Sequence, residues 1–175
     1  MKPKPGLGLT STAPFWYTRF RVAAYVGVLG SLVWTVAIAL PFAPFSYLPP
    51  IIVGGGPGMW FVLSYVLYMT VSIGGFGALS FFLYVIEVQE KRALDQTTIA
   101  LGFVLLVFGV IASCAMLATA GGLSGYGLTH ANATETATQN LLESFVYPVA
   151  AAVIVSAIGA ALVVLSMARA RVRAG

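Results

Sequence analysis

The chain alternates long apolar runs with short polar segments, a pattern typical of proteins that cross a membrane several times. The clearest run extends from Met59 to Ile86 and contains no charged side chain. As a helix, this run would reach roughly 40 Å at about 1.5 Å per residue. A bilayer core about 30 Å thick needs about 20 apolar residues to cross it. The run therefore predicts a membrane-spanning helix with length left for tilt or for projecting beyond one face.

Three further apolar runs complete a set of four. The expected spans are about 22–40, 59–86, 97–119 and 144–168, separated by an outer loop 41–58, a link 87–96 and a second outer loop 120–143. Connections this short make neighbouring helices antiparallel. We therefore expect one domain over residues 1–175, an all-α membrane protein folded as a four-helix transmembrane bundle. With four spans, both termini and the link 87–96 lie on the same side.

The start of the chain carries signals of its own. Residues 1–13 are expected to be extended, and residues 15–21 mix aromatic side chains with Arg19 and Arg21. That mixture is typical of an interfacial segment anchored at the lipid headgroups. The span 22–40 also matches the apolar core of a secretory signal peptide, with 37–39 as a cleavage-like site. We expect a retained helix here.

The composition agrees with a membrane location. Of the 175 residues, 59% are hydrophobic and only 8% are charged, whereas a soluble domain averages about a quarter charged residues. So few charged side chains cannot cover a water-exposed surface, which predicts an integral membrane protein. The single cysteine, Cys114, cannot form an internal disulfide and lies within an apolar run, so we expect a small buried hydrophobe there.

The distribution of positive charge predicts the orientation. All lysine and arginine residues fall on the side shared by the termini and the link 87–96, and the opposite loops contain none. They are Lys2, Lys4, Arg19, Arg21, Lys91, Arg92, Arg169, Arg171 and Arg173. The positive-inside rule makes that side cytoplasmic, so we expect a multi-pass protein of the plasma membrane with both termini inside. The basic face should attract anionic lipid headgroups, which explains its charge without a nucleic-acid partner.

Small residues recur on all four spans, where they would let helix backbones approach closely. The candidate packing residues are Gly27 and Ser31 in the first span, Gly74, Gly75, Gly77 and Ala78 in the second, Gly109 and Ser113 in the third, and Ala152, Ser156 and Ala160 in the fourth. The glycines of the second span could alternatively be incidental on a lipid-facing helix. These faces exceed what four helices need among themselves, so the remainder are expected to contact other integral membrane subunits.

The membrane interior lacks ionisable chemistry, because no Asp, Glu, Lys, Arg or His falls within the expected spans. A charge retained there would have marked an ion path, a proton relay or a substrate site. Glu87 directly follows the second span and is expected to be a solvated cap. We therefore expect no catalytic residue, no cofactor-binding residue and no cofactor in this chain.

The outer loops contain three features with a possible chemical role. His130 with Glu135 or Glu143 could supply metal ligands, but the spacing matches no closed site, so we expect no metal. The glycine run 54–58 lacks the Lys-Ser/Thr of a phosphate-binding loop and predicts a tight turn. Asn132 begins an Asn-Ala-Thr triplet that matches the N-glycosylation pattern, although such triplets arise often by chance.

The absence of interior chemistry, combined with surplus packing faces, predicts a non-catalytic accessory subunit of a larger integral membrane complex. Within that class we favour respiratory or other energy-converting assemblies of the electron-transfer oxidase type, by analogy at class level. The alternative is a small stand-alone or homo-oligomeric transporter, channel or lipid-handling protein for an uncharged substrate. An outer-surface adhesion protein and a membrane enzyme are weaker candidates, because the loop 120–143 has no paired cysteines and no nucleophile–base arrangement is visible.

Overall fold

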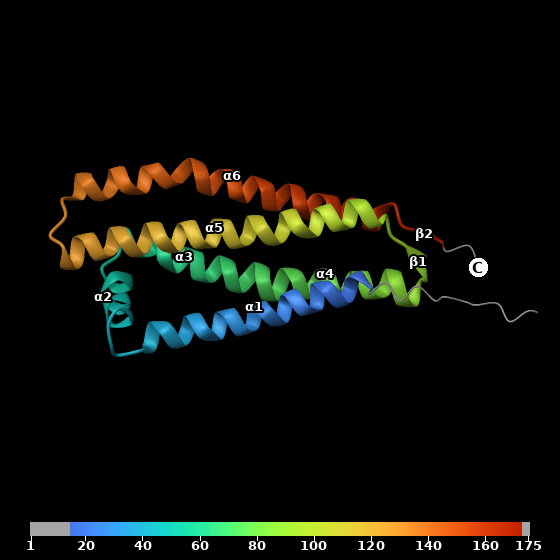
Figure 1. Cartoon of the computed structure of the whole chain (residues 1–175), viewed down its shortest axis with the longest axis horizontal. Helices are drawn as coiled ribbons and strands as arrows, with labels where there is room; N and C mark the ends of the chain where they lie inside the picture. The colour runs from blue at the N-terminus through green and yellow to red at the C-terminus, as the bar shows by residue number, and fades with distance from the viewer. Residues whose placement is uncertain (1–14, 173–175) are drawn as a thin grey trace, which may run out of the picture.

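The computed structural model describes residues 15–172, which form four long helices with short connections (Figure 1). In chain order the elements are α1 (Trp16–Ala39), η1 (Phe45–Tyr47), α2 (Leu48–Val53), α3 (Gly58–Met69), η2 (Thr70–Gly75), α4 (Phe76–Tyr84), η3 (Val85–Gln89), β1 (Arg92–Ala93), α5 (Gln96–His130), α6 (Glu135–Ala168) and β2 (Arg171–Val172). The segments α3, η2, α4 and η3 follow one another without a break and make one long helix, the second long helix. Its segments η2 and η3 are π-helical.

Four helices are long and apolar enough to cross a membrane, which confirms the prediction of an all-helical protein with four possible spans. These helices are Trp16–Ala39, Gly58–Gln89, Gln96–His130 and Glu135–Ala168. The expected extended start over 1–13, together with Lys2, Lys4 and Arg173, lies outside the described residues.

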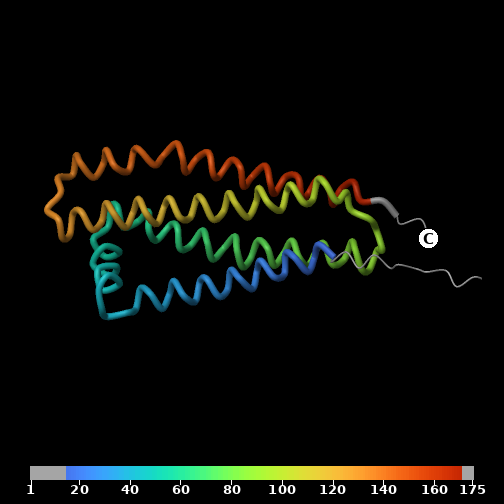
Figure 2. The backbone as a smooth tube through the Cα atoms, in the orientation of Figure 1, coloured from blue at the N-terminus to red at the C-terminus, as the bar shows by residue number. Residues whose placement is uncertain are grey.

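The four helices form an open layer in which each outer helix packs mainly on one neighbour. α6 packs along α5, α5 also packs on α3, and α1 packs on α4 and η2. Figure 2 shows this order, with α6 and α1 at the two edges of the layer. Large apolar side chains consequently remain exposed along both edge helices, including Val26 and Val33 on α1 and Ile154 on α6. Such surfaces suit lipid or another membrane protein.

Two opposite ends of the layer differ in character. One end, which we call the basic end, carries Arg19, Arg21, Lys91, Arg92 and Arg169. Here β1 and β2 pair antiparallel, with Arg92 opposite Val172. This pairing joins the link 87–96 to the segment that follows α6. The largest fully buried apolar side chains are Phe20, Leu83, Ile99 and Val163, which belong to one hydrophobic core. At the far end, α2 lies across the ends of the long helices (Figure 1).

The prediction of an outer loop over 120–143 is wrong, because most of this segment is helical. α5 continues to His130 and α6 begins at Glu135, which leaves only 131–134 as a connection. Glycines normally weaken a helix, but Gly121 and Gly125 are buried here. An added Cβ would collide with the Phe61 backbone at Gly121 and with the Ile51 side chain at Gly125. Close packing against α3 and α2 therefore stabilises a helix in the segment that was expected to be a loop.

The expected outer loop over 41–58 is also partly helical. α2 occupies Leu48–Val53 and places its two prolines in the first turn, where a missing N–H costs little. The glycine turn that follows bears out the prediction for residues 54–58. Gly55 and Gly56 have φ values of 68° and 51°, a conformation that glycine adopts readily.

A close contact between α5 and α6 generates the first prediction. A Cβ on Gly109 of α5 would lie 2.5 Å from the backbone nitrogen of Ser156 on α6. We expect Gly109→Ala to force the two helices apart and to lower the free energy of unfolding by about 1–3 kcal/mol. Unfolding of the purified chain in detergent measures this change.

Gly122→Ala on the same helix is the matched control, because a Cβ there would meet no atom within 4 Å. We expect this variant to be as stable as the wild type or slightly more stable. Equal destabilisation of the two variants would contradict the close α5–α6 contact.

Candidate functional site

Several of the sequence-predicted small residues lie at close helix contacts. Gly109 faces Ala152 and Ser156 across the α5–α6 interface. Gly27 of α1 lies against Ser72 of η2, so that an added Cβ would come within 2.6 Å of the Ser72 Cβ. Because glycine has no side chain, the helix backbones can approach each other this closely.

The remaining predicted packing residues of these helices are less tightly engaged. Ser31 is buried, and its hydroxyl has no hydrogen-bond partner. Ser113 is buried and its hydroxyl donates to the Val110 carbonyl oxygen at 3.0 Å. Ala160 is partly buried against the hydrophobic core.

The glycine cluster of the second long helix does not pack within the chain, which corrects the expectation that it joins the helices. A Cβ on Gly74 or Gly77 would meet no atom within 4 Å, and one on Gly75 would meet only Val71 of its own helix. Ala78 is exposed. The buried face of this helix runs instead through Ser72, Phe76, Ser80 and Leu83.

Other tight glycine contacts involve Gly102 and Gly159, which the sequence places on the small faces of the third and fourth spans, and Gly30, which the sequence did not single out. Gly159 of α6 faces Gly102 and the Leu106 backbone of α5, and Gly30 of α1 makes room for the Tyr68 hydroxyl. Gly102 and Gly109 lie on one face of α5 at helical spacing, which was the available signal. Gly30 carried no comparable signal, because its partner is a side chain on another helix.

Glu87 forms a buried polar contact at the basic end. The backbone N–H of Trp16 donates to Glu87 Oε1 at 3.2 Å, and that of Tyr17 donates to Oε2 at 3.0 Å. These N–H groups belong to the first turn of α1, which has no intrahelical partners for them and carries the positive end of the helix dipole. Glu87 is only 4% exposed, so the expectation of a solvated cap on its own helix is wrong. It caps α1 instead.

Three further hydrogen bonds surround Glu87, and together with it they form what we call the polar junction. Trp16 Nε1 donates to Gln96 Oε1 at 2.6 Å, and the Ser80 hydroxyl donates to the Tyr17 carbonyl oxygen at 2.9 Å. The Ser166 hydroxyl donates to the Asp95 carbonyl oxygen at 3.4 Å. The polar junction thereby links α1, the end of the second long helix, α5 and α6.

Asp95 begins α5 at the edge of the polar junction. The Thr97 N–H donates to Asp95 Oδ1 at 3.2 Å, and the Thr98 hydroxyl donates to Oδ2 at 2.5 Å. The Thr98 hydrogen bond, followed by the Thr97 hydrogen bond and a smaller attraction from Arg169, lowers the pKa of this carboxyl below its ordinary value of 3.8. Asp95 is therefore an anionic helix cap at neutral pH.

At the far end, His130 lies in an aromatic cluster and not in a set of acidic ligands. Its ring stacks on Tyr126 with 5.1 Å between centroids and meets Tyr47 edge-on at 4.7 Å. His130 Nδ1 is 2.6 Å from the Thr129 hydroxyl. Within residues 15–172, no three His, Cys, Asp or Glu side chains gather closely enough to hold a metal ion.

Asn132 occupies the short connection between α5 and α6. It is exposed and has a φ of 50°, a conformation that asparagine tolerates better than most residues. Its side chain is accessible at a surface turn, and its glycosylation stays a prediction.

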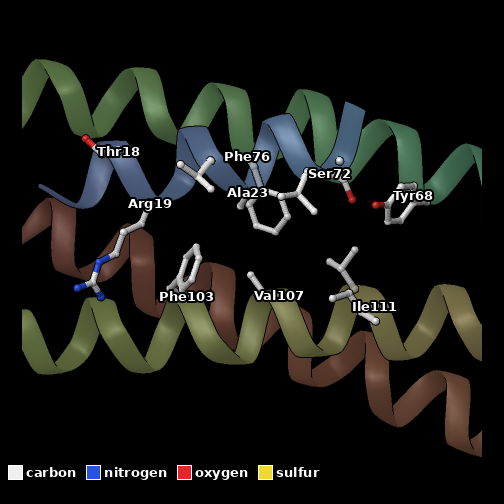
Figure 3. A pocket seen from close by; sticks show the side chains of 13 residues that line it. Thr18, Arg19, Ala23, Tyr68, Ser72, Phe76, Phe103, Val107 and Ile111 are labelled. Carbon is white, nitrogen blue, oxygen red and sulfur yellow. The ribbon is translucent and has the colours of Figure 1, made fainter. Parts of the chain in front are cut away.

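An apolar groove runs along α1 between the second long helix and α5 (Figure 3). Its volume is about 440 Å³. Val22 and Val26 of α1, Phe76 of α4, and Phe103 and Val107 of α5 form most of its wall. Arg19 lies at one end of the groove, and Tyr68 and Ser72 lie at the other (Figure 3).

No protein-family model, curated protein or solved structure matches this chain.

The buried carboxylate generates the second prediction. Glu87→Gln keeps one acceptor oxygen but replaces the other by an NH₂ group, which cannot accept from a backbone N–H. We expect this variant to lose about 1–3 kcal/mol of stability, because a buried donor of α1 is left without a partner. Unfolding in detergent measures the loss.

Glu90→Gln provides the matched control near the same helix end. Glu90 is 44% exposed and forms an ion pair with Arg92 at 3.1 Å, so its substitution should change stability by less than about 0.5 kcal/mol. Similar effects of the two substitutions would show that the Glu87 contact with α1 is unimportant.

The lowered pKa of Asp95 generates a pH-dependent prediction. A depressed pKa in the folded state contributes stability that is present above the ordinary value of 3.8 and is lost as the pH falls through the folded value. We expect Asp95→Asn to be less stable than the wild type at pH 7, and this difference to disappear in strong acid. Thermal unfolding of both proteins across this range tests it, and a difference that does not change with pH would contradict it.

Proposed function

We propose that this chain is a non-catalytic accessory subunit of a larger integral membrane complex in the plasma membrane. One observation carries the proposal: the chain leaves a close-packing face empty. The helix contacts at Gly27, Gly109 and Gly121 are filled by neighbouring helices, whereas Gly74 and Gly77 face open space. Small residues that no helix of the same chain approaches are suited to receive a helix of another chain.

The buried polar groups support a structural role. The Ser64 hydroxyl donates to the Cys114 carbonyl oxygen at 2.6 Å, linking α3 to α5, and the Ser80 hydroxyl links α4 to α1. Glu87 is the buried charged residue among those described, and both of its oxygens accept from α1. These groups hold helices together.

The charge distribution supports an orientation with both termini in the cytoplasm. Arg19 and Arg21 begin α1, Lys91 and Arg92 lie in the link before α5, and Arg169 follows α6. The positive-inside rule places this end at the cytoplasmic face. The Arg19 guanidinium lies over the Trp16 ring, 4.3 Å from its centroid. Such a pair suits an interfacial segment in contact with anionic lipid headgroups.

Within this class we favour a respiratory or other energy-converting complex of the electron-transfer oxidase type. This preference rests on analogy, since small helical subunits without cofactors commonly flank a metal-bearing core in such complexes. Other integral membrane subunits are then the partners of the empty face.

A second candidate function is a stand-alone or homo-oligomeric transporter, channel or lipid-handling protein for an uncharged substrate. The apolar groove along α1 favours it, because a hydrophobic molecule could lie there. The chain would then act without partner subunits.

Gentle extraction from the native membrane separates the two functions. The extract is run on a native gel, co-migrating chains are identified by mass spectrometry, and the visible absorption of the band is recorded. A large band containing catalytic chains with haem or metal absorption is expected. A small colourless band of this chain alone would overturn the accessory role.

The empty face generates a prediction of its own. We expect Gly74→Leu to remove this chain from the large band, because the added side chain keeps a partner helix away. The isolated variant should unfold like the wild type, since a Cβ at Gly74 meets nothing in the chain. Gly122→Leu on α5 has equally open surroundings and should leave the large band intact. Retention of Gly74→Leu in the complex would exclude this face as the contact.

A further inference from the structure

The groove along α1 has the dimensions of a single lipid chain in one leaflet. On α1 its lining residues extend from Thr18 to Gly27, a distance of about 13 Å at about 1.5 Å per residue. Half of a bilayer core is about 15 Å thick. The groove therefore begins at the basic end and reaches close to the middle of the membrane.

The walls of the groove are apolar and open towards the lipid. Val22 and Val26 are 53% and 58% exposed along its edge. Phe76 forms part of its floor, and Phe103 and Val107 form the opposite wall on α5 (Figure 3). A hydrocarbon chain suits such a surface, because each methylene that it places against these side chains makes dispersion contacts with them.

The entrance of the groove carries a positive charge that the described residues do not neutralise. Figure 3 shows the Arg19 guanidinium at this end, on the same side as Phe103. Within residues 15–172 the ion pair joins Arg92 to Glu90, and no carboxylate reaches Arg19. A guanidinium offers a planar set of donors that matches a phosphate group. The entrance thus complements an anionic headgroup directly above an apolar groove.

We propose that this groove binds one anionic phospholipid of the cytoplasmic leaflet. One acyl chain lies between α1 and α5 against Phe76 and Val107, and the phosphate accepts hydrogen bonds from Arg19. The proposal rests on the orientation given under the proposed function, but it is independent of any partner subunit. It names a defined site, in place of a general attraction between the basic end and the membrane surface.

Native mass spectrometry of the full chain in detergent tests the headgroup contact. The protein is titrated with phosphatidylglycerol and with phosphatidylcholine of the same acyl chains. The wild type should retain one phosphatidylglycerol in preference to phosphatidylcholine, and Arg19→Gln should weaken that binding about fivefold. Arg21→Gln is the matched control, because Arg21 carries the same charge at the same end of α1 but does not line the groove. Equal effects of the two substitutions would overturn the site in favour of diffuse attraction.

A second pair of variants tests the acyl chain position. Val107→Phe fills the groove from α5 and should reduce the retention of both lipids. Val104→Phe on the same helix is the control, because Val104 is 60% exposed and does not line the groove. If Val107→Phe unfolds, Ala23→Leu fills the groove from α1 instead. Unchanged lipid retention in the folded groove variants would overturn the proposal.

These measurements use the purified chain, so their failure is distinct from failure of the accessory role. Loss of lipid binding in Arg19→Gln with an intact large native band would support the lipid site, and it would show that the contact with partner subunits does not depend on that site. A missing large band with intact, Arg19-dependent lipid binding would overturn only the accessory role.

Discussion

The structure depends on the contact between Glu87 and the first turn of α1. Segments about seventy positions apart are joined because the Glu87 carboxylate accepts hydrogen bonds from the backbone N–H groups of Trp16 and Tyr17. A carboxylate buried without partners would be very costly, and leaving the first N–H groups of a buried helix end without partners would also cost stability. Each satisfies the other. The contact fixes where α1 begins. It thereby places the Trp16 side chain so that its Nε1 reaches Gln96 and its ring lies near the Phe103 ring of α5.

Fixing α1 at the basic end has consequences along its whole length. Near that end, Phe20 packs edge-on against Phe103 of α5 with 4.9 Å between ring centroids. Further along, α1 stays on the second long helix alone, where Gly27 lies against Ser72 and Trp34 packs against Phe61. α1 is therefore joined to α5 at one end only. The groove lies between α1 and α5 from Arg19 past Phe103 (Figure 3), so it starts at the end of α1 that the Glu87 contact anchors.

Hydropathy was sufficient to predict the four long helices, because each contains a run of apolar residues longer than a bilayer requires. Details that depend on contacts between distant residues were not predictable in the same way. The segment 120–143 was expected to be a loop, yet the packing of Gly121 and Gly125 against Phe61 and Ile51 accompanies a continuous helix α5. The role of Glu87 required knowing that the start of α1 lies beside it. Gly74, Gly75 and Gly77 were expected to pack against another helix of the chain. The π-helical segment η2 instead places Ser72 against α1, and these glycines contact no neighbouring helix among the described residues.

An open layer of helices leaves different surfaces for different neighbours, and their chemistry separates them. At Gly74 and Gly77 the second long helix carries no side chain, so another helix backbone can approach closely there. The groove beside α1 is lined by branched and aromatic side chains and ends at Arg19, which no carboxylate of residues 15–172 reaches. A flexible chain with an anionic head satisfies both requirements of that groove. The two surfaces lie on different sides of α1, so one can receive protein while the other receives lipid.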